Sequence, residues 1–456
     1  MTDNPFPKEF WWGVATSAFQ IEGAVDEDGR SPSIWDTFTH TPGKIRDGSD
    51  ADVATDHYHR FREDVGLMRE LGVNAYRFSI SWSRILPDGT GRRNPDGVAF
   101  YRRLCEELLA SNITPVATLY HWDLPQVLQD RGGWLSPDSR HWFAEYAVAA
   151  KETLGDLIGV WATLNEPWCA AFLGHSAGEH APGLTDPGAG FVAAHNLMLA
   201  HHDAIAAMRE HRSDGDQLGV VLNLIPAWPA SDDPADAAAA AKVDMVQNKL
   251  FLEAVFNGRY PDEVVEWHRR FGVADQIDLE ALAAARQPID FLGVNYYNVN
   301  RVRHVPGAPA PGPWPGADEA VIVVPEGPLT DMGWAVDPEG LTWTLKRVAT
   351  EYPPLPLYVC ENGAAYPDAD PVDGTIEDPD RIRYLESHIE ALAEAIRQGV
   401  DVRGYFVWSL LDNFEWAKGY TMRFGIVHVD FNTQKRTIKA SGRWYRDHIA
   451  RVTGDG

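Results

Sequence analysis

The sequence predicts an α/β fold, a single (β/α)8 TIM barrel with long βα loops that occupies residues 1–456 as one domain. Two observations predict this class. Eight short runs rich in β-branched and aromatic residues recur along the chain, and longer amphipathic patterns separate them. Strands that are apolar nearly throughout are typical of a parallel sheet covered by helices, and eight such units close most simply into a barrel.

The predicted strands are short, and polar residues lie at or just beyond their carboxyl ends. In chain order they are residues 12–16, 73–80, 113–120, 158–164, 218–225, 289–296, 355–360 and 402–409. A doubly wound open sheet is the alternative fold. It is disfavoured because no Gly-x-Gly-x-x-Gly follows the first strand.

Between the predicted strands, apolar residues recur at the spacing of a helix. The predicted helices are 57–71, 97–111, 138–154, 190–212, 242–256 and 379–399, and the alanine-rich run 235–241 is also predicted to be helical. Residues 304–328 are rich in proline and glycine and are predicted to form a long irregular loop after the sixth strand.

The composition excludes several classes of protein. A formal net charge of −26 repels phosphate backbones, so no nucleic-acid partner is expected. The amino terminus lacks a basic segment followed by an apolar one, and no apolar run reaches about 18 residues, so neither a signal peptide nor a membrane span is expected. Only three cysteines occur, which fits a reducing compartment and predicts a cytoplasmic protein.

Two glutamates stand at the carboxyl ends of predicted strands. Glu166 lies in Thr-Leu-Asn-Glu-Pro-Trp and Glu361 in Tyr-Val-Cys-Glu-Asn-Gly. The carboxyl ends of barrel strands share one face, so these side chains are predicted to face each other across a cleft. One protonated and one ionised carboxyl group are the minimum needed to cleave a glycosidic bond. The alternative is that each is an ordinary strand-end residue bonded to nearby backbone.

The other strand ends carry amides, carboxyls and indoles. Such a mixture suits a sugar, whose hydroxyl groups need polar partners and whose ring faces need aromatic surfaces. These residues are Gln20, Glu22, Arg77, Trp82, His121, Trp122, Asp123, Asn165, Asn223, Asn295, Tyr297, Asn362, Trp408, Glu415 and Trp416.

Two of these residues have a structural and a functional interpretation. Arg77 within an apolar strand needs a buried partner, which is either a structural ion pair or Glu361 held ionised. His121 is either a core histidine or, beside Trp122, a ligand-binding residue. No metal is expected, because the histidines and cysteines show no His-x-x-x-His or Cys-x-x-Cys pattern.

In combination these motifs resemble glycoside hydrolase family 1, the β-glucosidase family. The resemblance spans essentially the whole chain in order. It rests on Phe-Trp-Trp-Gly-Val-Ala-Thr-Ser-Ala-Phe-Gln-Ile-Glu-Gly at 10–23, Tyr-Arg-Phe-Ser-Ile-Ser-Trp at 76–82, His-Trp-Asp-Leu-Pro at 121–125, the two glutamate motifs, Asn-Tyr-Tyr at 295–297, Trp-Ser-Leu-Leu-Asp-Asn-Phe-Glu-Trp at 408–416 and Phe424-Gly425.

The resemblance implies roles for individual residues. Glu361 would be the nucleophile and Glu166 the acid/base, with Arg77 and Tyr297 orienting Glu361. Trp168, Asn223 and Trp334 would form the aglycone site. The implied substrate-binding residues are Gln20, His121, Trp122, Asn165, Asn295, Tyr297, Trp334, Trp408, Glu415, Trp416 and Phe424.

The implied function is a hydrolase of polysaccharide and cellulose breakdown. It would be a retaining β-glucosidase that acts on cellobiose and short or aryl β-glucosides from the non-reducing end, with no cofactor and a small β-glycoside as its partner. A broad β-galactosidase/β-fucosidase stays open, as do the sugar epimer, chain-length preference and oligomeric state. One departure from the family is Cys360, where threonine usually precedes the nucleophile; this thiol would be oxidant-sensitive if it were reachable.

Three rival functions make different demands on the sequence. A thioglycosidase usually has glutamine in place of the acid, and Glu166 argues against it. A phospho-β-glycosidase needs cations beside the sugar hydroxyls. Lys418 and Tyr420 lie near that point and are interpreted as part of a surface loop. A non-catalytic sugar-binding protein would have no use for both glutamates and Arg77.

Overall fold

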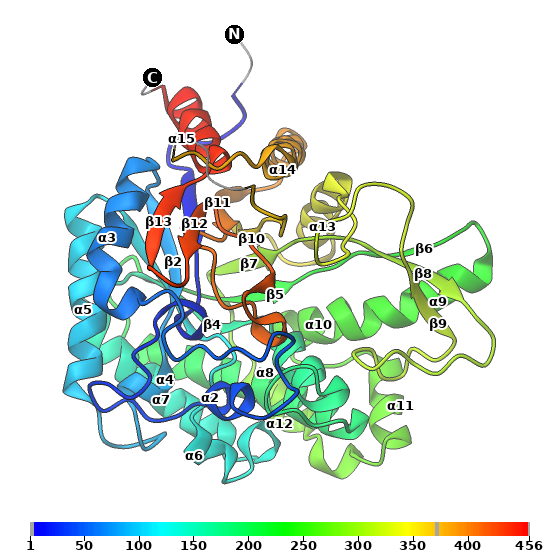
Figure 1. Cartoon of the computed structure of the whole chain (residues 1–456). Coiled ribbons are helices and arrows are strands. Elements are labelled where there is room, and N and C mark those ends of the chain that lie inside the picture. The colour runs from blue at the N-terminus through cyan, green and yellow to red at the C-terminus, as the bar shows by residue number, and fades with distance from the viewer. Residues whose placement is uncertain (1–3, 370–373, 455–456) are drawn as a thin grey trace.

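The computed structural model describes residues 4–369 and 374–454 and contains a closed barrel of parallel strands (Figure 1). β1 closes the ring because it pairs with β2 on one side and β11 on the other. The predicted (β/α)8 fold is therefore confirmed. In their order around the barrel the strands are β1 (Trp11–Ala15), β11 (Val402–Trp408), β10 (Leu357–Asn362), β7 (Phe291–Asn295), β5 (Gln217–Asn223), β4 (Val160–Asn165), β3 (Thr114–Tyr120) and β2 (Ala75–Ser79).

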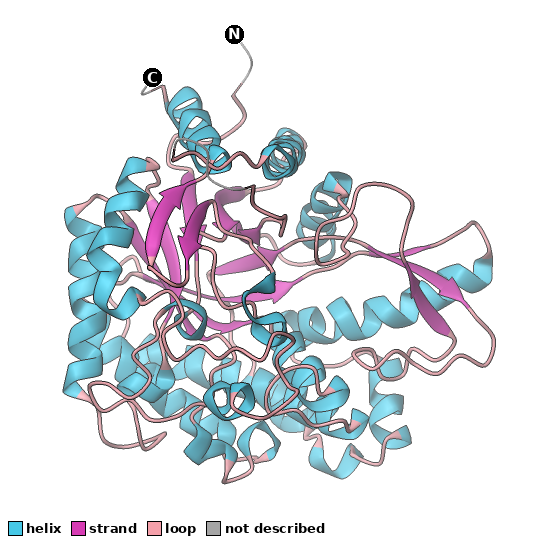
Figure 2. Ribbon diagram, viewed as in Figure 1, coloured by secondary structure: helices cyan, strands magenta, loops and turns pink. Residues whose placement is uncertain are grey.

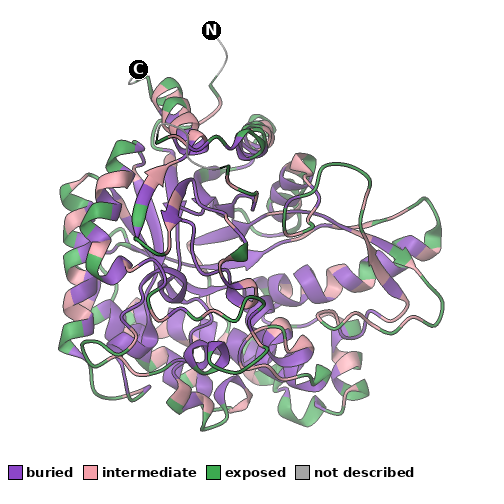
Figure 3. Ribbon diagram, in the orientation of Figure 1, coloured by how far each residue is buried: buried purple, intermediate pink, exposed green. Residues whose placement is uncertain are grey.

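Helices cover the outside of this ring, as Figure 2 shows. Their outward faces are exposed while the strands are buried (Figure 3). The longer helices are α3 (His57–Glu70), α5 (Pro95–Ala110), α7 (Ser139–Leu154), α8 (Pro187–Glu210), α9 (Pro234–Asp244), α10 (Leu250–Asn257), α11 (Asp262–Arg270), α13 (Pro338–Glu351), α14 (Pro379–Arg397) and α15 (Ala440–Thr453). The shorter ones are α1 (Ala18–Ile21), α2 (Ile34–Thr39), α4 (Trp82–Ile85), α6 (Gln126–Gln129) and α12 (Leu279–Ala285).

Five helices begin with the same local signal, an aspartate or asparagine followed by proline. The first residue suits the N-cap, and proline at the first helical position loses no hydrogen bond and has a suitable φ. The side chains of Asn94, Asp186 and Asp233 accept hydrogen bonds from backbone N–H groups of the first turn. The two other helices of this kind are α13, after Asp337, and α14, after Asp378.

The prediction of an irregular loop over residues 304–328 is wrong in part. Residues 320–323 form the strand β9 (Ala320–Val323), which pairs antiparallel with β8 (Asn300–His304). A third strand, β6 (Ala227–Pro229), completes a small sheet that projects from the barrel beside α9 (Figure 1). The Ala-Val-Ile-Val sequence of β9 favours a strand, but the proline-rich residues before it obscured this signal.

A second small sheet was not predicted at all. β12 (Val427–Asp430) and β13 (Lys435–Ile438) form an antiparallel hairpin between the last barrel strand and α15. The two described ends of the chain lie close together at one end of the molecule (Figure 1), where the Asn4 amide donates to the carbonyl of Val452. Among the described helices, none combines the length and the apolar character that a membrane span requires.

The barrel interior is filled by side chains that alternate with those facing the helices. Small and large residues share this space, so the barrel is a packed core. Cys360 belongs to it and is 2% exposed. The inward-facing strand residues of this core are Ala15, Ala75, Val116, Val160, Ala162, Val221, Phe291, Tyr358, Cys360, Phe406 and Trp408.

Candidate active site

A cavity of about 490 Å³ opens at the carboxyl ends of the barrel strands. Side chains from the ends of β3, β4, β5, β7, β10 and β11 border it, together with loops that follow them. Of the residues predicted for a site, those bordering the cavity are His121, Trp122, Glu166, Trp168, Asn223, Asn295, Tyr297, Trp334, Glu361, Trp408, Glu415, Trp416 and Phe424.

The two glutamates lie together in this cavity. Asn295 Nδ2 donates to Oε1 of Glu166 at 2.6 Å, and the same amide also stabilises the ionised form of Glu361. One amide therefore reaches both carboxyl groups, which face each other as the strand-end positions predicted. Neither glutamate is an isolated strand-end residue bonded only to backbone.

The surroundings of Glu361 favour its ionised form. Arg77 Nη1 donates to Oε1 at 2.7 Å, and the Tyr297 hydroxyl donates to Oε2 at 2.6 Å. Burial raises the pKa of Glu361, while Arg77 and Tyr297 act against this rise. Burial also raises the pKa of Tyr297 well above its usual value, so its hydroxyl stays protonated and donates.

Among the residues that the structure describes, no cation contacts Glu166 directly. Burial first, and then the charge of Glu361, raises the pKa of Glu166 to about 8. Because Arg77 bonds one carboxylate and not the other, the negative charge of the pair resides on Glu361 and the proton on Glu166. The environments thus separate an ionised from a protonated carboxyl group.

His121 borders the cavity with a neutral ring. The Asn165 amide donates to its Nε2 at 3.1 Å, which leaves the proton on Nδ1, a buried atom that has no partner among the described residues. Burial and then the charge of Arg77 lower the pKa of His121 well below its usual value, so the ring is neutral. A neutral ring at this position suits an uncharged ligand.

Indole rings form the walls around this histidine. Trp408 and Trp416 lie nearly parallel to it, each with its ring centroid 5.8 Å away. Trp122 packs against Trp416 at 4.5 Å. Three residues here, Trp122, Glu166 and Trp416, have positive φ angles, a strained conformation for bulky side chains that concentrates at functional sites.

A third carboxyl group, Glu415, borders the cavity. Burial, followed by the charges of Glu361 and Glu166, raises the pKa of Glu415 to about 8, and the Gln20 amide partly opposes this by donating to it at 3.3 Å. A group poised in this way both donates to and accepts from a hydroxyl. Lys418, interpreted from the sequence as part of a surface loop, is half-buried and also borders the cavity.

Three predicted site residues lie behind the cavity wall. The Gln20 amide donates to Asn413, to the backbone carbonyl of Phe414 and to Glu415. Asn165 Oδ1 accepts from Arg77 Nη2 at 2.7 Å and from Asn295 at 3.0 Å. These positions place Gln20, Asn165 and Arg77 in contact with residues that border the cavity.

Comparison with known proteins agrees with this geometry. The sequence model of glycosyl hydrolase family 1 matches residues 2–453. This chain belongs to glycosyl hydrolase family 1. It is 48% identical to the 1,4-beta-D-glucan glucohydrolase of Thermotoga neapolitana, over 97% of this chain and 98% of the relative, and 47% identical to beta-glucosidase A of Thermotoga maritima, over 98% of both chains.

Solved structures of family 1 enzymes share the whole architecture. A psychrophilic beta-glucosidase from Micrococcus antarcticus superposes with a TM-score of 0.94 at 47% identity over 98% of both chains. The Thermotoga maritima beta-glucosidase in complex with glucoimidazole gives a TM-score of 0.93 at 45% identity over 98% of this chain and 99% of that one.

Several cavity residues of this family 1 chain were not predicted. Five of these twelve come from two places: the π-helix Cys169–Ala177 that follows Glu166, and the segment 304–328. Trp168 and Trp314 pack at 5.5 Å, which joins the two. Proximity to Glu166 in the sequence could have indicated Cys169. The unpredicted residues are Cys169, Leu173, Glu179, His180, Ile225, Asn298, Asn300, Pro313, Trp314, Ile322, Met332 and Ala417.

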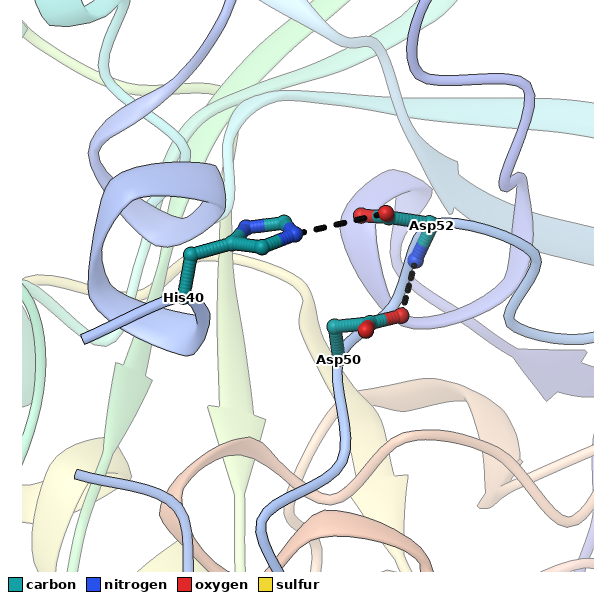
Figure 4. A group of neighbouring side chains, drawn as sticks. All are labelled: His40, Asp50 and Asp52. Atoms are coloured by element: carbon teal, nitrogen blue, oxygen red, sulfur yellow. Dashed lines mark hydrogen bonds and ion pairs between the residues drawn. The ribbon is translucent and has the colours of Figure 1, made fainter. Parts of the chain in front are cut away.

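Two groups of described residues have donors close enough to hold a metal ion. In the first, drawn in Figure 4, His40 Nε2 lies 3.3 Å from Asp52, whose backbone N–H donates to Asp50 at 3.1 Å. His40 Nδ1 lies 2.7 Å from the carbonyl of Asp36, and this contact is the largest cause that raises the pKa of His40. A surface ion pair accounts for these contacts.

The second group already holds its own cations. Lys439 Nζ lies 2.8 Å from both Asp368 and Asp412, and Arg423 Nη1 lies 2.8 Å from Asp412. His428 contacts the same two aspartates. The site that a metal would occupy is therefore filled by an ion-pair network, which fastens β12 and β13 to the loop after β10.

Replacing Lys439 by methionine should destabilise the protein by about 3–5 kcal/mol, because two buried carboxylates would lose the cation that bridges them. Denaturant unfolding of Lys439→Met beside wild type measures this, and Lys435→Met, at an exposed position of the same hairpin, is the matched control. A chelator should leave wild-type stability unchanged. A lower stability with chelator would instead identify a metal site.

Proposed function

We propose that this protein is a retaining β-glucosidase that hydrolyses cellobiose and other short or aryl β-glucosides from their non-reducing ends. The observation that carries this proposal is the asymmetry of the carboxyl pair, in which Arg77 and Tyr297 bind Glu361 while Glu166 is buried without a cation. The names of the Thermotoga relatives and the glucose-like inhibitors bound to similar structures support the glucoside substrate.

In the first step Glu361 attacks the anomeric carbon as a nucleophile. A bond forms between that carbon and a carboxylate oxygen, the glycosidic bond breaks, and Glu166 transfers its proton to the departing oxygen. The charge of Glu361 raises the proton affinity of Glu166 before this step. Esterification removes that charge, so Glu166 becomes a stronger acid as the proton is needed and is left as a carboxylate afterwards.

In the second step water releases the sugar. Glu166, now ionised, takes a proton from the water as its oxygen attacks the anomeric carbon, and the ester bond to Glu361 breaks. Two inversions at one carbon leave its configuration unchanged. None of these steps needs a metal or an organic cofactor, because the two carboxyl groups supply both the nucleophile and the proton.

The substrate-binding roles follow from the same arrangement. We assign His121, Glu415 and Trp416 to the sugar hydroxyls, Trp408 to the sugar face, and Trp168 and Trp334 to the leaving group. Gln20, Asn165 and Arg77 would act from behind by fixing Glu415, His121 and Glu361. Cytoplasmic action on cellulose-derived sugars completes the proposal, and it is supported by three cysteines that are all unpaired.

Glu361→Ala should lose about 10⁴-fold or more in rate, because it removes the nucleophile on which both steps depend. Azide should restore turnover by occupying the vacated face, and its product should be an α-glycosyl azide. Rates on a nitrophenyl β-glucoside, with product analysis by NMR, measure both effects. Wild-type activity in a preparation free of contaminating enzyme would overturn the assignment of Glu361.

The activity lost in Glu166→Ala should depend strongly on the leaving group of the substrate. Substrates with poor leaving groups need the proton and should nearly stop, whereas dinitrophenyl glucosides should still form the covalent intermediate. The intermediate then accumulates because the base is missing, so stopped-flow measurements should show a burst, and azide should give a β-glycosyl azide. Equal losses for all leaving groups, with no burst, would show that Glu166 is not the acid/base.

The protein should prefer neutral sugars to 6-phosphorylated ones. A phosphate adds roughly two negative charges beside Glu415 in a buried cavity that already holds ionised Glu361. Lys418 is the only opposing cation among the described residues that border this cavity. The Tyr420 hydroxyl already donates to the carbonyl of Asp50, so it is not free for a phosphate.

The measurement is kcat/KM for a nitrophenyl β-glucoside beside that for its 6-phosphate. Glu415→Ser should narrow the difference between these two kcat/KM values, because it lowers the value for the neutral substrate more than the value for the charged one. Lys418→Met serves as the matched variant and should lower only the value for the phosphate. A higher value for the phosphate with the wild-type protein would contradict the prediction.

A further inference from the structure

The structure places a thiol against the carboxyl group of Glu166. The chain turns from β4 directly into the π-helix Cys169–Ala177, and the backbone N–H of Cys169 donates to the carbonyl of Glu166 at 2.9 Å. This turn brings Cys169 Sγ to 3.1 Å from Glu166 Oε2. Cys169 borders the cavity and is 6% exposed.

Neighbouring groups fix the direction of this contact. Asn223 Nδ2 lies 3.7 Å from Cys169 Sγ and donates to it, so the single thiol hydrogen is available for Glu166. Burial, followed by the charge of Glu166, raises the pKa of Cys169 well above its usual value, which keeps the sulfur protonated. When Glu166 is ionised, the contacts therefore run from Asn223 through Cys169 to Glu166.

The two oxygens of Glu166 have partners of different kinds. Oε1 accepts from the Asn295 amide nitrogen at 2.6 Å, and an amide N–H can only donate. A carboxyl proton on Oε1 would compete with the amide hydrogen of Asn295 for the same side of that oxygen. The proton of Glu166 therefore belongs on Oε2, the atom that faces Cys169. A thiol both donates and accepts, and it therefore suits an oxygen that is protonated in one step and bare in the next.

We propose that Cys169 is a positioning residue for the acid/base: its sulfur accepts from protonated Oε2 of Glu166 and its S–H donates to the ionised form. The proposal rests on the proposed function, in which Glu166 cycles between these two states. The contact holds Oε2 in one orientation throughout the cycle. Because a thiol is both a weak hydrogen-bond donor and a weak acceptor, it favours neither protonation state of Glu166 strongly.

The three cysteines differ in where they lie relative to the cavity. Cys360 precedes Glu361, but it is packed in the barrel core and does not border the cavity. Cys105 is buried on α5, away from the cavity. Within the described chain, Cys169 is thus the cysteine in contact with the cavity, and the conditional prediction that Cys360 is a reachable thiol is not supported by its position.

The test compares the pH profile of kcat/KM for Cys169→Ala, Cys169→Ser and wild type. Loss of the donor destabilises ionised Glu166, so the alkaline limb of Cys169→Ala should move up by about 0.5 pH unit. Below its folded pKa the carboxyl is protonated in either protein, so the shift should be confined to this limb. Cys169→Ser keeps a group that donates and accepts, and its limb should lie at or below that of wild type.

A second readout distinguishes positioning from general disruption. At pH 6, kcat/KM of Cys169→Ala should fall roughly 3–10-fold for alkyl glucosides, which need a correctly oriented proton, and stay within about 2-fold for dinitrophenyl glucosides, which do not. Cys105→Ala is the matched control, because it removes a buried thiol that does not border the cavity. It should leave kcat/KM unchanged for both substrates. Equal losses on both substrates, or an unmoved alkaline limb, would overturn the role of Cys169.

The outcome for Cys169 can be told apart from failure of the proposed function. If Glu166→Ala shows its leaving-group dependence while Cys169→Ala behaves like wild type, only the positioning role is wrong. If Glu166→Ala lacks that dependence, the acid/base assignment itself fails. Should Cys169→Ala not fold, Cys169→Ser decides alone, because an alkaline limb above that of wild type contradicts a donor at this position.

Discussion

The buried guanidinium of Arg77 is the contact on which the rest of the site depends. It donates to Thr118 on β3, to Asn165 at the end of β4 and to Glu361 on β10, while its own backbone belongs to β2. One cation thus ties four barrel strands together at the level of the cavity floor. A buried charge is costly without compensation, so its partners must stay ordered, and this order fixes where the carboxylate of Glu361 lies.

Burial is the largest cause of the pKa shifts of the surrounding polar groups, and the charges of this ion pair add to it. Arg77 opposes the protonation of Glu361 and lowers the pKa of His121, while the charge of Glu361 raises the pKa values of Glu166 and Glu415. The cavity therefore combines one ionised carboxylate with neutral hydrogen-bonding groups. Such a set can bind an uncharged polyol and still supply a nucleophile and a proton, which a row of equally charged carboxylates could not.

The sequence predicted what depends on local pattern and missed what depends on distant packing. The barrel strands were visible because they are apolar runs with polar residues at or just beyond their carboxyl ends. Glu166 and Glu361 could be paired because parallel strands align their carboxyl ends. β9 was missed because its partner β8 and the intervening prolines decide whether it pairs. The contact between Cys169 and Glu166 depends on a π-helical turn, which no residue pattern near Cys169 indicates.

The two ends of the cavity differ in how they are built, and this difference bears on substrate choice. The inner end carries His121, Glu361 and Glu415, whose orientations are fixed by hydrogen bonds. The outer end is formed largely by apolar side chains, such as Trp314 and Met332 on loops and Ile322 on β9. Directional hydrogen bonds discriminate between hydroxyl arrangements, whereas apolar burial gains roughly 25 cal/mol per Å² whatever the shape of the partner. A sugar held at the inner end is therefore selected strictly, and an aryl or glucosyl leaving group at the outer end only loosely.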